Sequence, residues 1–375
     1  MNPVLIFHTP ITFGGGETQL LLMCRDFLGR GRGVQVVNLA RSEEFERALA
    51  GIHVPFYTIT AQGVGFSPTR FSYVRHMLRI LLLAIRDGRL RKLYREHPVV
   101  WARGFPANFF VVVLSFLYGR KSKRLIYSHH FLKSPEQRAT RAAYLRVLRV
   151  FDSLVGVSHE VSESLRKVFP ELTERILTIP NAVDMNRFAL GEGKDELRRK
   201  LSIPEGVVGV YLARFSPQKN HAFLVDVLKR VPGFTLVLGG EGSELQNFMD
   251  KAKQEHIDER VKYCGHIHSS LVPMYLRAAD FCVFPSIGEG FSNAVLEALA
   301  SDLPVVLFRE VYSPELGDAV LIADSYDDFF EKVQELCTNL VLRQTMSAKA
   351  REVVHSFDVA VTAQAYLELF DKNFS

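Results

Sequence analysis

The chain of 375 residues is 47% apolar and 23% charged, a composition that argues against intrinsic disorder. Its length exceeds what one hydrophobic core usually supports, so we predict two domains. The net charge of +5 is unevenly divided, because residues 1–184 contain 26 Lys and Arg against 14 Asp and Glu, whereas residues 185–375 contain 20 against 27. The balances of +12 and −7 indicate two domains with separate partners or, alternatively, a soluble basic surface on the first domain.

Two sequence features bear on the location of the chain. Its four cysteines form no CxxC pair, which favours reduced thiols over a disulfide framework or a zinc site. The first residues, "MNPVLIFHTP", lack a basic region and a long apolar core, so we expect no signal peptide and a cytoplasmic location.

Two apolar stretches, residues 79–95 and 105–124, resemble membrane spans but are too short. The second has about 14 mostly apolar residues, whereas roughly 20 are needed to cross a bilayer. The basic segment 74–97 could lie on the inner face of an anionic cytoplasmic membrane, or it could be a buried helix with a solvated basic face. The sequence leaves these two alternatives open.

Short apolar runs alternate with helical segments along the chain, as expected of parallel α/β sheets. The pattern predicts an α/β fold with two Rossmann-like, doubly wound domains facing across a cleft. The N-terminal domain covers residues 1–184 and is joined by a C-terminal helix at 357–375, and the second domain covers residues 185–356. The predicted strands, in chain order, are 3–9, 33–40, 98–103, 124–130, 153–158, 206–214, 234–240, 261–266, 280–286 and 303–308.

The stretch "PSIGEGFSNAVLEALASDLPVV" (285–306) carries two glutamates with different settings. A helix is predicted to begin near Ser292 or Asn293, and its free N–H groups suit a phosphate. Glu289 lies beside that anion site, while Glu297 lies about 6–8 Å along the helix, where it can accept hydrogen bonds from ribose hydroxyls. One carboxylate for each sugar indicates a nucleotide-sugar site. The alternative is two surface glutamates near a helix N-terminus.

The segment "YLARFSPQKNH" (211–221) supplies two cations after a predicted strand. Arg214 and Lys219 can clamp a diphosphate and neutralise its charge as it departs. A solvated loop is the alternative. Because ligands bind at the carboxyl ends of parallel strands, we expect both cations to face the anion site.

In this order and spacing, the motifs resemble those of retaining glycosyltransferases with the GT-B fold, of the glycosyltransferase family 4 type. The resemblance extends over nearly the whole chain. It rests on "FGGGETQ" (13–19), "YSHH" (127–130), "VSHEV" (157–161), "IPNAVD" (179–184), "ARFSPQKN" (213–220), "GGEGSE" (239–244), "YLRAADFCVFPS" (275–286) and "EGFSNAVLEALA" (289–300).

The resemblance implies a donor site in residues 185–356 and an acceptor site in residues 1–184. It assigns the diphosphate to Arg214 and Lys219, the hydroxyls of the transferred sugar to Glu289, and the ribose to Glu297. The backbone of Phe291, Ser292 and Asn293 would meet the phosphate or the sugar.

In the N-terminal domain, the resemblance implies that Gly14 and Gly15 permit close approach of donor and acceptor. It also places His130 near the reacting carbon, whereas His129 would point to the other face of its strand. The expected catalytic residues are therefore Glu289, His130, Arg214 and Lys219.

Three positions depart from the family pattern. Asp302 and Ala182 stand where the family usually has glycine, and "FREVYSPELGD" (308–318) replaces a glycine-rich loop that often helps to hold the donor. The glutamates and the cation pair are intact, which favours an active enzyme.

The implied function is retaining transfer of a hexose from a nucleotide diphosphate sugar, UDP-sugar being favoured over GDP-sugar. The acceptor would be a hydroxyl of a glycan or lipid-linked substrate, in the assembly of bacterial envelope polysaccharide, capsule or lipopolysaccharide. We expect no metal and no cofactor, since the diphosphate is held by cations and "GHIH" (265–268) has no third ligand nearby. We expect no nucleic-acid partner, while the basic N-terminal domain could contact an anionic membrane.

Other functions remain open on the sequence alone. These are a nucleotide-sugar epimerase of the same fold, a phosphorylase with a pyridoxal-phosphate lysine, and a non-catalytic nucleotide-sugar-binding protein. A dehydrogenase is disfavoured because no G-x-G-x-x-G follows a strand with an acidic residue beyond it.

Overall fold

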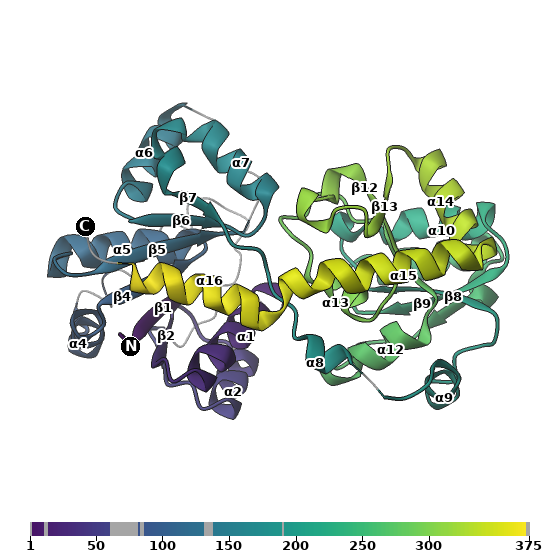
Figure 1. Ribbon diagram of the computed structural model, residues 1–375, viewed down its shortest axis with the longest axis horizontal. Coiled ribbons are helices and arrows are strands. Elements are labelled where there is room, and N and C mark those ends of the chain that lie inside the picture. The colour runs from purple at the N-terminus through teal and green to yellow at the C-terminus, as the bar shows by residue number, and fades with distance from the viewer. Residues whose placement is uncertain are drawn as a thin grey trace. The chain divides into compact units, whose positions relative to one another are not determined.

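The computed structural model describes residues 2–10, 14–60, 82, 86–130, 138–189 and 191–372. It divides the chain into two compact units, which are Met1–Asn181 with Val359–Ser375 (unit 1) and Ala182–Asp358 (unit 2). Each unit contains one parallel sheet with helices packed on it (Figure 1). The predicted α/β fold with two Rossmann-like domains is therefore confirmed.

Unit 1 has a seven-stranded sheet in the order β3-β2-β1-β4-β5-β6-β7. Its strands are β1 (Val4–His8), β2 (Val34–Asn38), β3 (Phe56–Thr58), β4 (Val99–Arg103), β5 (Arg124–His129), β6 (Ser153–Gly156) and β7 (Ile176–Thr178). Its helices are α1 (Gly15–Gly29), α2 (Glu43–Gly51), α4 (Gly88–Glu96), α5 (Phe105–Tyr118), α6 (Arg138–Leu148), α7 (His159–Val168), η1 (Pro170–Arg175) and α16 (Val359–Asp371).

Unit 2 has a six-stranded sheet in the order β10-β9-β8-β11-β12-β13. Its strands are β8 (Val207–Leu212), β9 (Phe234–Gly239), β10 (Val261–Tyr263), β11 (Phe281–Phe284), β12 (Val305–Phe308) and β13 (Val320–Ala323). Its α-helices are α8 (Met185–Phe188), α9 (Lys194–Lys200), α10 (His221–Arg230), α11 (Leu245–Gln254), α12 (Val272–Ala278), α13 (Asn293–Ala300), α14 (Tyr326–Thr338) and α15 (Leu340–Val354). Six short 3-10 turns complete it, namely η2 (Pro217–Lys219), η3 (Asp258–Arg260), η4 (Ser269–Leu271), η5 (Arg309–Val311), η6 (Pro314–Leu316) and η7 (His355–Phe357).

The ten predicted strands are all present, and the structure adds three that were not predicted. These are β3, β7 and β13, and each lies at the edge of a sheet. Strands β3 and β7 have three residues each and are only partly buried, so they lack the continuous apolar run by which a central parallel strand is recognised. Strand β13 has such a run, VLIA, and was overlooked.

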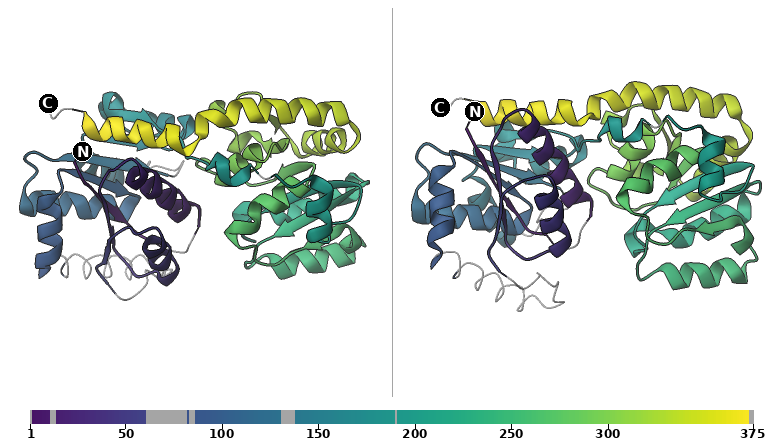
Figure 2. Two further views of the ribbon diagram at one scale, coloured as in Figure 1. Left: turned by 60° about the horizontal axis from the view of Figure 1, so that its bottom comes forward. Right: turned by 90° about the horizontal axis from the view of Figure 1, so that it is seen from below.

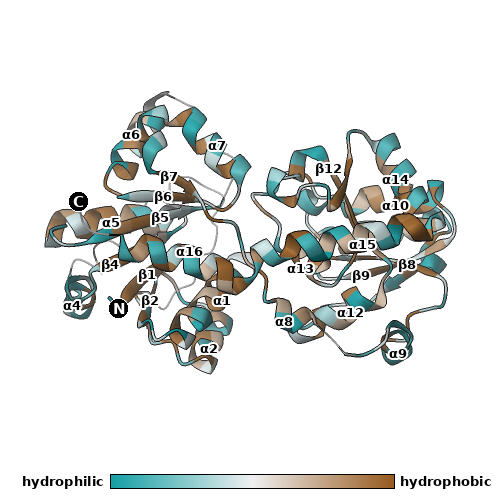
Figure 3. Cartoon of the chain, viewed as in Figure 1, coloured by the Kyte–Doolittle hydropathy of each residue, from teal (hydrophilic) through white to brown (hydrophobic). Residues whose placement is uncertain are grey.

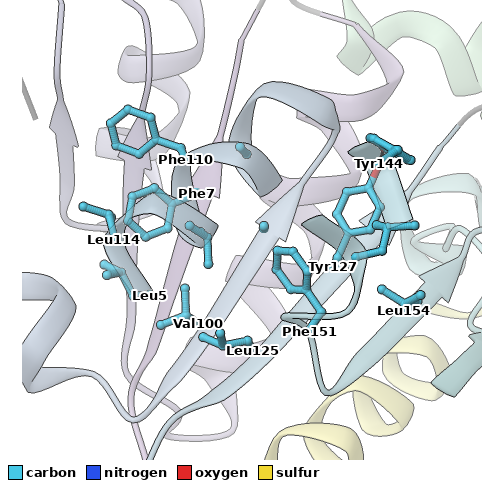
Figure 4. Packing of buried hydrophobic residues seen from close by; sticks show 14 of the residues in the cluster. Leu5, Phe7, Val100, Phe110, Leu114, Leu125, Tyr127, Tyr144, Phe151 and Leu154 are labelled. Atoms are coloured by element: carbon cyan, nitrogen blue, oxygen red, sulfur yellow. Dashed lines mark hydrogen bonds between the residues drawn. The ribbon is translucent and has the colours of Figure 1, made fainter. Parts of the chain in front are cut away.

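The sheet of unit 1 is buried on both faces, as a parallel sheet requires. On one face, Leu5 and Phe7 of β1 belong to a cluster that includes Phe110 of α5 and Phe151 after α6 (Figure 4). The alternate residues of β1 are also fully buried. Figure 3 shows the resulting pattern, in which strands are hydrophobic and the outer faces of helices are hydrophilic.

The last helix of the chain, α16, packs on unit 1 beside α1. Its Tyr366 ring lies 4.6 Å from the Trp101 ring of β4, centroid to centroid, and Phe370 lies 5.9 Å from the same ring. Arg32, whose side chain is fully buried, donates to the Asp371 carboxylate at 2.7 Å. Residues from the two ends of the sequence thus form one core.

The six strands of unit 2 follow the same order as the first six of unit 1, with the first strand of each unit inside its sheet. The chain winds outward in one direction through two further strands and then returns to the other side of the first strand. The order therefore reverses between β1 and β4 in unit 1 and between β8 and β11 in unit 2. Helices cover both faces of the sheets (Figure 2), so the carboxyl ends of these strand pairs are where an open α/β sheet binds ligands.

Candidate functional site

The candidate donor site lies at the switch point of unit 2. Arg214 and Lys219 follow β8, Glu289 follows β11, and these strands are neighbours. The Lys219 ammonium group forms an ion pair with the Glu289 carboxylate, and their side chains are only 20% and 14% exposed. Arg214 is exposed at the same edge. The structure therefore brings together two predicted residues that are 70 positions apart.

Hydrogen bonds hold the loops after β8 and β11 together. The Ile287 N–H group donates to the Gln218 carbonyl at 2.9 Å, and the Gln218 amide donates to the Gly288 carbonyl. The buried Tyr211 hydroxyl bonds the Lys219 carbonyl at 3.1 Å and lies 2.8 Å from the Ser286 hydroxyl. Because both loops are anchored, the Lys219–Glu289 pair is positioned before any ligand binds.

Two glycines allow a third loop to approach the same edge. Gly240 and Gly242 have φ values of +131° and +151°, and a Cβ atom on either would lie 2.1 Å from the carbonyl oxygen of Ala213 or Phe215. The Phe215 N–H group donates to the Glu241 carbonyl at 2.9 Å. The glycines of "GGEGSE" thus permit backbone contact that no other residue would allow.

The helix predicted near Ser292 or Asn293 is confirmed as α13, with Ser292 as its N-cap. The Ser292 hydroxyl makes no capping hydrogen bond, and the buried Phe291 ring packs 5.5 Å from the Phe357 ring. The helix N-terminus therefore follows the Glu289 loop directly, with its positive dipole end toward the candidate site.

Glu297 lies in the second turn of α13 and is half-buried. Burial raises the pKa of its carboxyl to about 7, against a smaller opposing effect of the Arg187 charge. Its protonation state therefore changes near neutral pH.

A second polar cluster lies at the switch point of unit 1, beside Gly14 and Gly15. Glu17 Oε1 lies 3.1 Å from His8 Nε2 at the end of β1, and Glu17 Oε2 accepts the Gly14 N–H group at 3.1 Å. Arg103, at the end of β4, donates to the Gly16 carbonyl at 3.0 Å. Glu17 and Arg103 thus anchor the glycine segment from two sides.

The charge states of His8 and Glu17 depend on their burial and on the groups that they contact. Burial lowers the pKa of His8, and the Arg103 charge adds to this effect. Burial alone would raise the pKa of Glu17, but the His8 hydrogen bond and nearby positive charge lower it. The favoured state is a neutral His8 beside an ionised Glu17.

Sequence reasoning missed His8, Glu17 and Arg103. Glu17 stands within the quoted motif "FGGGETQ", and His8 and Arg103 end their strands, so position at the carboxyl edge was the signal that could have found them.

His130 directly follows β5. Burial holds the pKa of its imidazole well below the usual value, and the charges of Arg103, His129 and His8 add to the effect. His130 is therefore neutral. Its neighbour His129 is buried, with Nδ1 2.9 Å from the Tyr127 hydroxyl, as expected of a structural histidine.

The departures from the family pattern have distinct local structures. Asp302 has φ +61° just after α13, the left-handed conformation that favours glycine, and its carboxylate lies 3.3 Å from Arg351 and 3.8 Å from Arg277. Ala182 is buried. The residues 308–318 form the two turns η5 and η6.

The described residues offer neither a cluster of metal ligands nor a helix that could span a membrane. The described residues contain no group of three or more His, Cys, Asp or Glu side chains that could hold a metal ion. His268, from "GHIH", accepts the Ser270 N–H group at the start of η4. In the described part of the chain, every helix is too short or too polar to cross a bilayer.

Comparison with known proteins identifies the family. The model described as "Glycosyltransferase Family 4" matches residues 13–187, and the model described as "Glycosyl transferases group 1" matches residues 206–339. Among solved structures, HepE of Anabaena in complex with UDP has a TM-score of 0.82 at 18% identity, covering 99% of this chain and 100% of that one.

Curated relatives match about half of this chain. The alpha-monoglucosyldiacylglycerol synthase of Streptococcus pneumoniae is 32% identical over 197 residues, which are 50% of this chain and 44% of that protein. The UDP-Gal:alpha-D-GlcNAc-diphosphoundecaprenol alpha-1,3-galactosyltransferase of Escherichia coli is 26% identical over 216 residues, 52% of this chain and 54% of that protein. The chain thus spans about half the length of these relatives. With both family models matched and the fold shared, it belongs to the glycosyltransferases of group 1 and family 4, which have the GT-B fold.

Proposed function

We propose that the chain transfers a hexose from a UDP-sugar to a hydroxyl of a glycan or lipid-linked acceptor, with retention of the anomeric configuration. The observation that carries this proposal is the Lys219–Glu289 pair at the switch point of unit 2, which precedes the N-terminus of α13 and has Glu297 in the second turn of that helix. Support comes from relatives named for UDP-Gal transfer and for glycolipid synthesis, and from UDP bound to HepE.

In this proposal the donor diphosphate is held by Arg214, Lys219 and the N–H groups that begin α13. Lys219 turns from Glu289 to the phosphate, and Glu289 is then available to the hydroxyls of the transferred sugar. The ionised carboxylate of Glu297 accepts the ribose hydroxyls. Cations and helix dipole stabilise the charge that develops on the departing diphosphate, so no metal and no cofactor is required.

The acceptor side of the proposal rests on unit 1. Neutral His130 can accept or donate a hydrogen bond near the reacting carbon, and the departing phosphate takes the proton of the acceptor hydroxyl. Gly14 and Gly15 leave room for both substrates. The setting we propose is assembly of envelope polysaccharide, capsule or lipopolysaccharide at the inner face of a membrane.

The direct test is turnover of a Glu289→Ala variant. We expect a loss of at least about 10²-fold, which is roughly 3 kcal/mol of transition-state stabilisation. Glu255→Gln, which removes an exposed carboxylate paired with Lys229 in the same unit, is the control and should be unchanged. Near-normal turnover of folded Glu289→Ala contradicts the assigned role. The anomer of the product and activity in EDTA, read in the same assay, test retention and metal independence.

A further inference from the structure

A polar hollow lies in unit 2 at the edge of the sheet opposite the candidate donor site. It has a volume of about 380 Å³, and its lining includes Asp280, which directly precedes β11, and Leu303, which precedes β12. Glu289, by contrast, follows β11. The hollow therefore lies at the amino edge of the sheet, and its volume is within the roughly 300–1,000 Å³ of small-molecule sites.

Four helices form the walls of this hollow. Helix α12 packs against α9 and α13, and α13 packs against α15. The lining comes from the start of α9, the ends of α12 and α13, and one face of α15. On α15 the lining residues recur every three or four positions, as expected of one helix face, and they are Leu340, Arg343, Gln344, Ser347 and Arg351.

Four cationic side chains line the hollow, namely Lys194, Arg277, Arg343 and Arg351. The Asp302 carboxylate is shared by Arg351 at 3.3 Å and Arg277 at 3.8 Å. Within the described residues, these two guanidinium groups form no other ion pair and no hydrogen bond. Most of their N–H donors are therefore available to a ligand.

Arg343 is anchored but its charge is not neutralised. Its Nη1 donates to the Leu336 and Cys337 carbonyls at the end of α14, and no carboxylate of the described residues pairs with it. Its Nε and Nη2 atoms remain as donors. Arg343 also lies in the first turn of α15, where the positive end of the helix dipole disfavours a cation. An anion bound here would stabilise both the guanidinium group and the start of the helix.

The other two carboxylates of the lining are already paired as well. Asp280 is shared by Lys194 at 2.8 Å and Arg198 at 2.7 Å, and Glu192 lies 3.1 Å from Lys200. The hollow therefore keeps a positive excess after each of its carboxylates has found a partner. Such an excess suits a phosphate group.

We propose that this hollow binds a small phosphorylated molecule that also carries hydroxyl groups, of which a sugar phosphate is the simplest. The phosphate binds Arg343, Arg351 and Arg277, because guanidinium groups present forked donors that match phosphate oxygens. The hydroxyl groups hydrogen-bond to the Asp302 carboxylate and to the polar side chains of α15. The proposal goes beyond sugar transfer, because it assigns a second ligand site at the other edge of the sheet.

Calorimetry of the full chain with glucose 6-phosphate, inorganic phosphate and glucose tests the proposal. We expect glucose 6-phosphate to bind, inorganic phosphate to bind more weakly, and glucose to show no measurable binding. Absence of glucose 6-phosphate binding overturns the proposal. So does inorganic phosphate or glucose that binds as tightly as glucose 6-phosphate.

Two variants change the hollow without removing a buried side chain. Ser347→Glu places a carboxylate four positions from both Arg343 and Arg351, where it pairs with these cations and repels phosphate. Arg351→Gln removes one exposed cation. Each variant should bind glucose 6-phosphate at least about tenfold more weakly than the wild type.

The matched controls lie outside the hollow. Thr345→Glu adds the same charge at an exposed position of α15, and Lys253→Gln removes an exposed cation from α11. Because water and salt screen exposed charges, both should bind within about twofold of wild type. Equal losses in the controls and in the variants of the hollow overturn the proposal.

Lys219→Gln distinguishes the hollow from the candidate donor site. It should bind glucose 6-phosphate as the wild type does, because Lys219 follows β8 at the other edge of the sheet. Binding that is lost in Lys219→Gln but kept in Ser347→Glu overturns the proposal. Melting curves of the hollow variants and controls should match wild type, since the substituted side chains are exposed or half-buried. The measurement requires no sugar transfer, so its outcome is distinguishable from failure of the proposed function.

Discussion

Glu17 connects the end of the first strand to the first turn of the first helix. One carboxylate oxygen of Glu17 hydrogen-bonds His8, and the other accepts the Gly14 N–H group. Arg103, on the neighbouring strand, donates to the Gly16 carbonyl. A charged hydrogen bond of this kind contributes about 1.5–3 kcal/mol. These contacts give Glu17 a positioning role for the glycine segment.

Replacing Glu17 tests this role. Glu17→Ala should lower kcat/KM by about tenfold or more, because the glycine segment loses its anchor. Glu17→Gln should restore most of the activity, since its amide oxygen still accepts the Gly14 N–H group. Glu43→Gln, on the exposed start of α2, serves as the control. Equal losses in the Ala and Gln variants would contradict a positioning role.

Glu297 should make stability depend on pH. In the unfolded chain its carboxyl titrates near 4.5, and in the folded chain at about 7. Between these values the unfolded state has released a proton that the folded state retains. The free energy of unfolding therefore includes the full contribution of the protonated Glu297 carboxyl below pH 4.5. This contribution decreases as the pH rises and is lost once the pH has passed through 7. The melting temperature of wild type relative to Glu297→Gln should fall from pH 5 to pH 8, and a constant difference would show that the carboxyl titrates normally.

The same carboxyl should couple nucleotide binding to proton release. If the carboxylate accepts ribose hydroxyls, binding of UDP lowers its pKa and releases a proton near pH 6.5. Calorimetry in two buffers with different ionisation enthalpies measures this release, which Glu297→Gln should reduce.

At the scale of elements, two opposing energies act on Asp302 at the end of α13: its backbone conformation is strained, and its side chain forms ion pairs. Asp302 adopts φ +61°, which costs an ordinary residue about 1 kcal/mol and glycine nothing. Its ion pairs with Arg351 and Arg277 are partly exposed and contribute between 0 and about 1 kcal/mol. These two terms nearly cancel, which explains why aspartate is tolerated where the family usually has glycine.

Substitution of Asp302 separates the two terms. Asp302→Ala loses the ion pairs and keeps the backbone strain, so it should be less stable than Asp302→Gly by about 1 kcal/mol. Asp302→Gly should lie within about 1 kcal/mol of wild type. Denaturant unfolding measures all three, and an alanine variant as stable as the glycine variant would show that the conformation carries no strain.

Elements differed in how well they could be predicted. The central strands were predicted because burial on both faces leaves an uninterrupted apolar run, as in β8 and β11. The edge strands β3 and β7 carry three residues each and leave no such run, whereas β13 carries the apolar run VLIA and was overlooked. The start of α13 was predicted because its N-cap residue is a local signal.

At the scale of the whole molecule, the chain leaves unit 1 at residue 181 and returns at residue 359. Unit 2 is therefore one continuous segment. Its two ends meet, because Val183 donates its N–H group to the Phe357 carbonyl at 2.8 Å. Unit 1 needs both ends of the chain.

Truncation after residue 358 should unfold unit 1 but leave unit 2 folded. It removes the four large apolar side chains that α16 buries, each contributing about 1.5–3 kcal/mol, and their sum is comparable to the stability of a whole domain. These side chains are Tyr366, Leu367, Leu369 and Phe370. Calorimetry should show a single transition for the truncated chain, matching that of the isolated segment 182–358. A second transition in the truncated chain would contradict this prediction.

The sequence by itself determined the two parallel α/β domains, the central strands and the residues expected at the donor site. Local sequence patterns predict these features, because burial, helix capping and the position of loops after strands depend on residues that are neighbours along the chain. Only the tertiary structure decided that Lys219 pairs with Glu289, that His8, Glu17 and Arg103 form one cluster, and that Arg32 pairs with Asp371. Such contacts join residues that are far apart in sequence. The strand order that brings these residues together cannot be inferred from any short stretch of sequence.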